Sequence, residues 1–263
     1  MNKKLIFIFI FYIINISYMK ALSVDLVSSS QLLSVAEITL LAPTPAAAFY
    51  QPALYNTGIA FNHSNPFGFT ELNVLHLATQ FKIKNEMFSL GSVTLNNEII
   101  DDKAIYIGYS KSLNNISLGI SAKYYHFGIK DYESINGFTA GIGAVWVYDI
   151  FTHGLSYSNI TNTNIKGIDL PNVFKYECLI SPFDNTRFGF AFEKEKSFEM
   201  RYAFAANQEV SKYLYIMTGF ITNPSQFSAG FTCVIGQVEI SYGFRTHAQL
   251  GYTQAVGVGW VFK

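Results

Sequence analysis

The sequence predicts an all-β protein, a closed antiparallel transmembrane β-barrel of about 14 strands with a short N-terminal plug or cap segment. Three observations predict it: few charges, long alternating runs, and no second apolar stretch that could form a membrane helix. The 263 residues carry 18 basic and 18 acidic side chains, and 14% of residues are charged, against roughly 25% in soluble domains. So few charges cannot cover a water-exposed surface of this size, so we expect part of the exterior to face lipid. Nucleic acid is not an expected partner, because nucleic-acid binding needs a basic surface.

The N-terminus has the pattern of a secretory signal peptide over residues 1–21. Two lysines precede an uncharged apolar stretch at residues 5–19, and Ala21 is a small residue at the predicted cleavage site. A membrane anchor is the alternative, but about 15 apolar residues fall short of the roughly 20 that a spanning helix needs. We therefore expect the chain to be exported.

Residues 22–55 are predicted to form a plug or periplasmic cap. Helical periodicity in residues 32–41 is weak, and residues 38–70 contain no Asp, Glu, Lys or Arg. Pro43, Pro45, Pro52 and Pro66 interrupt that uncharged stretch, and prolines break helices. An exported chain without a second helical span can cross a membrane only as a closed barrel, which satisfies every backbone hydrogen bond.

The barrel domain, residues 56–263, is predicted from two-residue alternation in runs of about ten residues, the length that a tilted membrane strand requires. In residues 186–194, for example, Phe188, Phe190 and Phe192 alternate with small or charged residues such as Gly189 and Glu193. We expect the bulky face to point outward and the small face to line the lumen. A soluble exported sandwich also alternates and remains an alternative, but its strands are typically five or six residues long.

Counting such runs predicts 14 strands, an even number as in bacterial barrels; counts of 12 or 16 remain open. The longest connections are expected at residues 127–136 and 159–172. The predicted strands cover residues 56–63, 73–83, 86–94, 102–112, 115–126, 137–148, 150–158, 173–182, 185–194, 197–206, 212–222, 225–234, 236–246 and 252–262.

Six charged side chains fall on the predicted lumen face. An arginine facing lipid near the midplane costs roughly 2–4 kcal/mol, so an inward orientation is strongly favoured. The charges either line a substrate path or form a salt-bridge network that fills a closed lumen, and their nearly equal signs favour the network. These lumen-lining charges are Arg187, Glu193, Glu199, Arg201, Glu239 and Arg245.

The cysteines and histidines indicate neither a metal site nor a cofactor. Cys178 and Cys233 fall on the lipid face of strands that are not neighbours, so we expect free thiols. No zinc-ligand spacing occurs. An outer-membrane hydrolase is an alternative that would pair His153 with Ser156, or His126 with Ser134. No residue pattern singles out these pairs, so we expect no catalytic residue and no enzymatic activity.

Two segments carry a resemblance to a known family. The sequence AAAFYQPAL at residues 46–54 resembles the signature near the start of FadL-like outer-membrane proteins and, more narrowly, of the PorV/PorQ branch associated with type IX secretion. The final strand pair resembles that family's closing strands. The resemblance implies a 14-stranded barrel with an N-terminal segment packed into or beneath the lumen. The chain departs from the family at Gln51, where Asn is usual, and in lacking glycine over residues 28–44. The matching positions are Ala48, Phe49, Tyr50, Pro52, Ala53, Tyr242, His247, Leu250 and Gly251.

The resemblance implies a non-enzymatic protein of the outer membrane that serves protein secretion. Its expected partners are outer-membrane lipid and secretion-machinery or cargo proteins. A FadL-like channel for hydrophobic small molecules is the alternative, and it needs an apolar pocket and a lateral exit. Pro182 and Pro224 lie at predicted strand ends, so few prolines are expected to kink a strand, which favours the secretion role.

Overall fold

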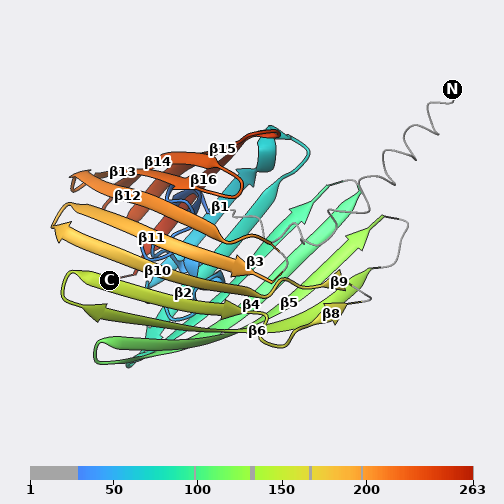
Figure 1. Ribbon diagram of the computed structural model, residues 1–263, viewed down its shortest axis with the longest axis horizontal. Helices are drawn as coiled ribbons and strands as arrows, with labels where there is room; N and C mark the ends of the chain where they lie inside the picture. Colours follow the sequence, from blue (N-terminus) through green and yellow to red (C-terminus); the bar gives the residue numbers. More distant parts are fainter. Residues whose placement is uncertain (1–28, 98, 131–133, 166–167, 197, 263) are drawn as a thin grey trace.

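A computed structural model describes residues 29–97, 99–130, 134–165, 168–196 and 198–262. The predicted signal peptide lies outside these residues. Within them, fourteen antiparallel strands close into a barrel, which confirms the predicted fold class (Figure 1). The barrel closes where β1 pairs with β16, with Phe61 opposite Val258. The barrel strands are β1 (Gly58–Asn65), β2 (Val74–Ile83), β3 (Glu86–Asn96), β4 (Ile100–Leu113), β5 (Ile116–Ile129), β6 (Ile135–Tyr148), β7 (Phe151–Ser158), β10 (Val173–Phe183), β11 (Thr186–Glu195), β12 (Arg201–Ser211), β13 (Leu214–Ile221), β14 (Gln226–Ile235), β15 (Val238–His247) and β16 (Gly251–Val261).

The predicted strand positions are right for all fourteen strands, with three local differences. The strand predicted at residues 197–206 begins at Arg201, because a turn precedes it in which the Phe198 amide donates to the Glu195 carbonyl. The connection expected at residues 127–136 is shorter, because β5 and β6 extend into it. The connection at residues 159–172 contains a small hairpin of β8 (Asn164–Ile165) and β9 (Ile168–Asp169).

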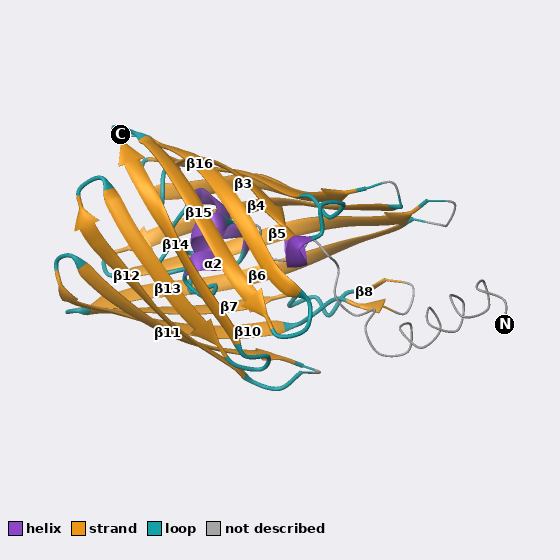
Figure 2. Cartoon of the chain, turned by 90° about the horizontal axis from the view of Figure 1, so that it is seen from above, coloured by secondary structure: helices purple, strands orange, loops and turns teal. Residues whose placement is uncertain are grey.

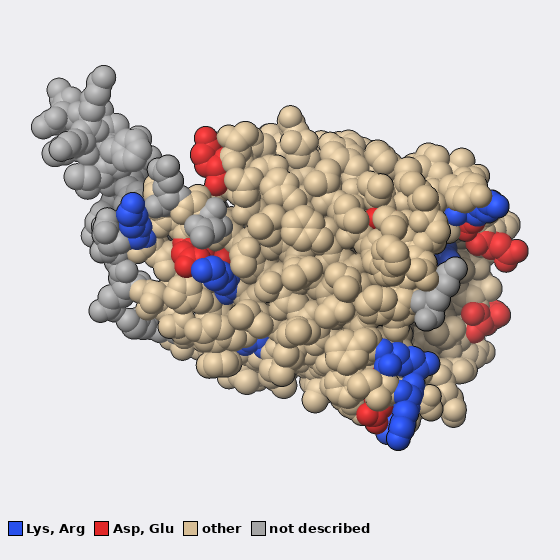
Figure 3. All heavy atoms as spheres, turned by 180° about the vertical axis from the view of Figure 1, so that it is seen from behind, with Lys and Arg blue, Asp and Glu red and all other residues tan. Residues whose placement is uncertain are grey.

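The outward face of the barrel is an apolar belt. Large side chains on successive strands are about half exposed, for example Ile120 at 58%, Phe204 at 51% and Val258 at 52%. Figure 3 shows one side of the molecule, where most charged residues gather towards the two ends. An apolar surface of this extent on a closed barrel is stable in contact with lipid, so the barrel spans the outer membrane.

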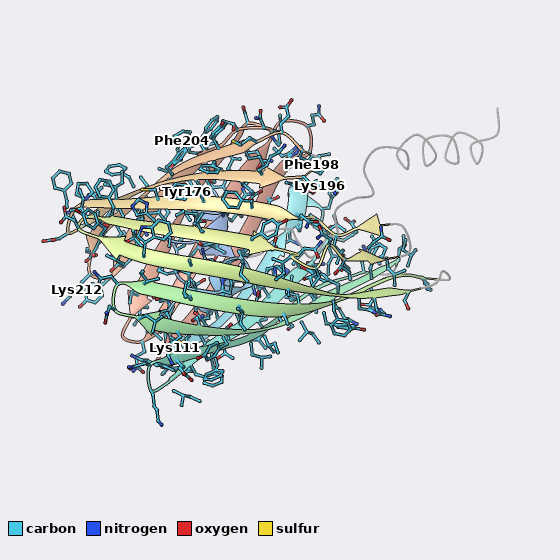
Figure 4. The ribbon with its side chains drawn as sticks, turned by 60° about the horizontal axis from the view of Figure 1, so that its bottom comes forward. Lys111, Tyr176, Lys196, Phe198, Phe204 and Lys212 are labelled. Carbon is cyan, nitrogen blue, oxygen red and sulfur yellow. The ribbon has the colours of Figure 1, made fainter. Side chains whose placement is uncertain are left out.

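The two ends of the barrel differ in the length of their connections. At one end, here called the short-turn end, tight turns join the strands, and Lys111 and Lys212 lie there (Figure 4). Lys196 and Phe198 lie at the opposite, long-loop end, where β4, β5 and β6 project past the neighbouring strands (Figure 2). Short turns are typical of the periplasmic side of such barrels and longer loops of the extracellular side.

Residues 29–57, here called the inner segment, lie inside the barrel. They include the short helix α2 (Ser30–Ser34), which Figure 2 shows within the ring of strands, and the 3-10 turn η2 (Pro45–Phe49). A second 3-10 turn, η3 (Pro66–Gly68), belongs to the loop between β1 and β2. Most inner-segment side chains are buried. The segment expected as a plug or cap is thus packed into the lumen. None of the helices in the described ranges has the length and apolar character to cross a membrane.

Candidate functional site

Inward-facing glycines make room for the inner segment. A Cβ atom on Gly119 would overlap the backbone carbonyl of Pro52, and one on Gly143 would overlap the Gln51 side chain. Gly119 and Gly143 face each other across β5 and β6, so the segment lies directly on the sheet there. The small residues that the sequence places on the lumen face therefore serve close approach of backbone to backbone. Further inward glycines in contact with the segment are Gly154, Gly189, Gly219, Gly230, Gly243 and Gly257.

The inner segment reaches strands around the whole circumference of the barrel. Its first residues lie against β14 to β16, where the Ser30 hydroxyl is 2.6 Å from the hydroxyl of Ser241. Farther along, the segment passes β10 and then β7, where Gln51 donates to the carbonyl oxygen of Leu155 (3.0 Å). Its end reaches β2, where Gln80 donates to the Leu54 carbonyl (3.1 Å). The lumen is therefore crossed by a segment that is bonded to the wall on opposite sides.

Three cationic side chains of the barrel strands surround the carboxyl group and the backbone carbonyl of Glu37. Glu37 lies on the side of the inner segment that faces the long-loop end. Arg245 Nη1 donates to Glu37 Oε1, and Arg201 Nη2 lies 3.5 Å from Glu37 Oε2. Arg201 also pairs with Glu193 on the neighbouring strand, with 2.8 Å between Nη1 and Oε1. Lys175 Nζ donates to the Glu37 carbonyl oxygen (2.5 Å). We call Glu37, Lys175, Arg201 and Arg245 the Glu37 cluster.

A second acid, Glu177, holds the next residues of the segment. Its side chain is 2% exposed and accepts hydrogen bonds from the Thr39 amide (2.9 Å), the Thr39 hydroxyl (2.6 Å) and the Leu40 amide (3.1 Å). Lys175 Nζ lies 2.8 Å from Glu177 Oε1 and balances its charge. Sequence reasoning missed Lys175 and Glu177, although they alternate with Phe174, Tyr176 and Cys178 in the pattern used for other strands.

The backbone and charge state of Glu37 are both unusual. Ala36 and Glu37 have φ angles of 53° and 66°, in the left-handed region that few residues other than glycine adopt. Burial alone would raise the pKa of the Glu37 carboxyl group. The charges of Arg245, Arg201 and Lys175 outweigh burial and lower the pKa from 4.5 to about 2. Glu37 is therefore an anion held by cations of the barrel wall.

The six charges expected in the lumen have three different positions. Glu193, Arg201 and Arg245 are brought together around Glu37. Glu239 and Arg187 lie towards the short-turn end: Glu239 accepts from Gln31 (3.2 Å), and Arg187 is exposed at the start of β11. Glu199 is exposed in the turn before β12 and not on a strand as expected, but it does line the second cavity.

Two adjacent cavities open above the inner segment at the long-loop end. The first has a volume of about 270 Å³ and the second about 540 Å³, and both are lined by Glu37, Phe198 and Arg201. Arg245 lines the second. The first cavity has mainly apolar and aromatic walls, and its lining also includes three cationic side chains and the three acids Glu37, Glu193 and Glu195. Its apolar lining includes Leu32, Phe49, Tyr50, Tyr125, Leu170 and Val173, and its cations are Lys123, Lys175 and Arg201.

The signature positions of the inner segment are packing positions. Phe49 is 1% exposed and makes an edge-to-face contact with Tyr106 (5.1 Å between ring centroids), and Lys123 Nζ lies 3.7 Å from the centroid of the Phe49 ring. Ala48 and Ala53 are each 1% exposed. Tyr50 lines the first cavity, and Pro52 lies on Gly119.

The signature positions near the C-terminus shape the connection between β15 and β16. His247 Nδ1 accepts from the amides of Gln249 (3.3 Å) and Leu250 (3.1 Å). Gly251 has a φ of 92°, which favours glycine. Tyr242 lies within β15, and its hydroxyl group donates to Gln254 Oε1 on β16 (3.4 Å). These residues stabilise a turn and the last strand pair.

Of the two histidine–serine pairs considered for a hydrolase, His153 and Ser156 lie on opposite faces of β7. His153 lies on the outward face, stacked on Trp146 and 2.8 Å from the Tyr176 hydroxyl, whereas Ser156 lines the first cavity on the inward face. His126 Nδ1 lies 2.8 Å from Asn136 Oδ1, and its Nε2 lies 3.8 Å from an Asp101 oxygen, so both ring nitrogens are engaged.

Cys178 and Cys233 are free thiols on β10 and β14. These two strands are not neighbours in the barrel. In the described part of the chain, no group of three or more His, Cys, Asp or Glu residues is placed to hold a metal ion.

Neither a protein-family model nor a curated protein matches the sequence. Among solved structures, the chain is similar to the Pseudomonas putida toluene transporter TodX, with a TM-score of 0.59 and 7% identity over 84% of this chain and 91% of that chain. The KdgM porin matches with a TM-score of 0.45 and 12% identity, over 79% of this chain and 100% of that chain. A mutant of the Rh. blastica porin matches with a TM-score of 0.46 and 10% identity, over 79% of this chain and 99% of that chain. The likeness to TodX shows a shared barrel fold.

Proposed function

We propose that this outer-membrane barrel binds small amphipathic molecules at its long-loop end and passes them into the lumen. The observation that carries the proposal is the first cavity, where Phe49, Tyr50, Tyr125 and Phe198 are aromatic lining residues beside both cationic and acidic side chains. Ligand sites are typically mainly apolar clefts with a few polar groups that orient the ligand. The proposal assigns no catalytic residue.

The size and position of the cavities support this choice. Typical ligand pockets measure roughly 300–1,000 Å³, and the two adjacent cavities measure about 270 and 540 Å³. Both lie at the long-loop end, which in barrels of this kind is the extracellular side. TodX, which shares the fold, is a toluene transporter, and this makes small aromatic compounds a suitable first set of test ligands.

Passage through the barrel requires part of the inner segment to move. The segment crosses the lumen and contacts the wall on opposite sides, so a solute in the first cavity meets Leu32 and Glu37 at its base. Binding and passage are thus separate steps, and binding is tested first.

The test uses the purified full chain in detergent and the neutral aromatic ligand 1-naphthylmethanol. We expect saturable binding that Phe198→Ala and Tyr50→Ala weaken about tenfold each, because each loses aromatic contact area. Phe204→Ala is the matched control, since Phe204 points outward from β12 (Figure 4). Absence of saturable binding, or equal loss in all three variants, would contradict the proposal.

A second candidate is the secretion-associated role that resemblance to the PorV/PorQ branch implies. The projection of β4, β5 and β6 at the long-loop end favours it, because these strands reach beyond the neighbouring wall. Their outward side carries Asp101, Lys103 and His126, polar groups suited to protein contact. Cross-linking in intact cells, followed by purification, tests this role. Recovery of one stoichiometric partner protein supports the role, and recovery of the barrel alone contradicts it.

A further inference from the structure

We propose that Arg201, Arg245 and Lys175 form an anion site that the Glu37 carboxylate occupies in this structure, and that an organic anion with an aromatic body competes with Glu37 for it. The inference rests on the proposed function, because it names the ligand class of the same cavities. In this account Glu37 is an internal competitor that keeps the site closed until such a ligand enters.

The arrangement around Glu37 is that of a bound carboxylate. Arg245 and Arg201 approach its two oxygens from different strands, and Lys175 binds the adjoining carbonyl. Planar guanidinium groups match carboxylate and phosphate oxygens in pairs, which makes arginine the usual choice for recognising such groups. The three cations line one or both cavities, so a ligand can reach the same groups from the exterior.

The two arginines have donor capacity that Glu37 does not use. Nε of Arg201 and both Nε and Nη2 of Arg245 are buried without a hydrogen-bond partner in the residues that the structure describes. A guanidinium group has five N–H donors, and a buried donor that makes no hydrogen bond is unfavourable. A ligand carboxylate or phosphonate would bring oxygen atoms to these donors as well as to those that Glu37 now engages.

Glu37 is easier to displace than the wall residues that bind it. It belongs to the inner segment, and its left-handed φ of 66° follows that of Ala36 at 53°. Backbone in this region is strained for residues other than glycine. An incoming anion keeps the arginines neutralised, and the displaced Glu37 carboxylate turns into the cavities that it already lines. Exchange of one anion for another avoids the cost of an unpaired buried charge.

The walls above the site determine the body of the ligand. Phe49, Tyr50 and Tyr125 line the first cavity, and Phe198 lines both cavities beside Arg201. Flat apolar groups pack well between aromatic rings. The geometry therefore assigns the site to an aromatic molecule with one anionic substituent.

The experiment compares 1-naphthoate with neutral 1-naphthylmethanol by calorimetry, using the full chain in detergent at pH 7. The variant Glu37→Gln removes the competing charge and keeps the shape of the side chain. We expect naphthoate to bind on the order of tenfold more tightly to this variant, because the competent site is no longer occupied. Because Glu37 lines both cavities, its substitution acts on the packing of both ligands, so the measured quantity is the ratio of naphthoate affinity to neutral-ligand affinity, which should rise about tenfold. A Glu37 that merely stabilised the fold would give weaker binding of both ligands on substitution.

Two further variants test the cations. In the double variant Glu37→Gln with Arg245→Met, an arginine is removed without leaving a buried acid, and naphthoate binding should fall about tenfold below that of Glu37→Gln. Arg187→Met is the matched control, because Arg187 faces inward at the opposite end of the barrel. Folding is checked by heat-modifiable migration. If Glu37→Gln fails to fold, the neutral variant Glu37→Asn replaces it, because asparagine tolerates the left-handed φ of this residue, and the same direction of change is expected.

The outcomes separate this inference from the proposed function. A rise of about tenfold in the ratio of naphthoate affinity to neutral-ligand affinity on Glu37→Gln supports the inference. Binding of neither ligand contradicts the proposed function and the inference with it. Binding of the neutral ligand, with no preference for naphthoate and no effect of Glu37→Gln, overturns the inference and leaves the function intact. Competition by inorganic phosphate at the same concentration as naphthoate would overturn the requirement for an organic body.

Discussion

The two halves of the inner segment are held in the barrel by different forces. The first half, residues 29–42, carries the Glu37 cluster and the bonds from Glu177, and it adds apolar contacts from residues such as Ile38 and Leu41. The second half, residues 45–54, is held mainly by apolar and aromatic packing around Phe49. Aromatic packing is insensitive to an incoming anion, whereas an ion pair can be exchanged for another ion pair. The difference indicates a fixed anchor in the second half and a releasable contact in the first.

The packing around Phe49 gives the largest expected effect. Phe49→Ala should lower the free energy of unfolding by about 4 kcal/mol, because it leaves a cavity against Tyr106 and His76. Urea titration of the barrel in detergent, together with hydrogen exchange of residues 45–54, measures it. Phe220→Ala is the control, since Phe220 is 42% exposed on the outward face. A loss no larger than that of the control would show that Phe49 does not anchor the segment.

The Glu177 contact comes next. Glu177→Ala should lower the free energy of unfolding by about 3 kcal/mol, because it removes three hydrogen bonds and leaves Lys175 buried without the carboxylate of Glu177. We expect faster hydrogen exchange at Thr39 and Leu40 and unchanged exchange around Phe49. The double variant Glu177→Leu with Lys175→Met should recover part of the loss, since no buried charge remains unpaired. Equal exchange in both halves of the segment would argue against separate anchoring.

A glycine comparison separates close approach from general loss of flexibility. Gly119→Ala should lower the free energy of unfolding by about 2 kcal/mol, because the added methyl group overlaps backbone atoms of Pro52 and Ala53. Gly259→Ala should be nearly neutral, since its nearest neighbours lie 3.6 Å or more from the added atom. Thermal unfolding of both variants measures the difference. The same cost at both positions would mean that Gly119 does not serve contact with the inner segment.

The pH dependence of the first half is the smallest effect. The pKa of Glu37 is lowered from 4.5 to about 2, so its stabilising contribution is fully present above about pH 4.5 and is lost as the pH falls through about 2. Hydrogen exchange at residues 30–41, corrected for intrinsic rates, should show constant protection from pH 8 to 5 and falling protection below 4.5. In the variant Glu37→Gln, protection of residues 30–41 should fall less below pH 4.5, because residue 37 no longer takes up a proton. Protection that already falls between pH 7 and 5 would contradict the assigned charge state.

Much of the barrel could be predicted from the sequence, because lipid and lumen impose opposite requirements on alternating residues. Phe188 and Phe204, expected to face outward, are 45% and 51% exposed. The Glu37 cluster could not be predicted, because Glu37 lies outside the strands and its partners come from β10, β12 and β15. Alternation assigns a residue to a face, but it does not say which residues meet across a lumen. Glu199 was misplaced because alternation continues through the turn before β12.

A disulfide between the inner segment and the wall tests most directly whether the segment is seated inside the barrel. The hydroxyl oxygens of Ser30 and Ser241 are 2.6 Å apart, so Ser30→Cys with Ser241→Cys, in a chain with both native cysteines replaced by serine, should cross-link on mild oxidation in isolated outer membranes. Ser30→Cys with Ser121→Cys should not, because Ser121 lies on β5, which the segment reaches near Pro52. Mass spectrometry of the digested protein reports both pairs. A cross-link in the first pair alone is the predicted result, and equal cross-linking of both pairs or of neither would contradict the account.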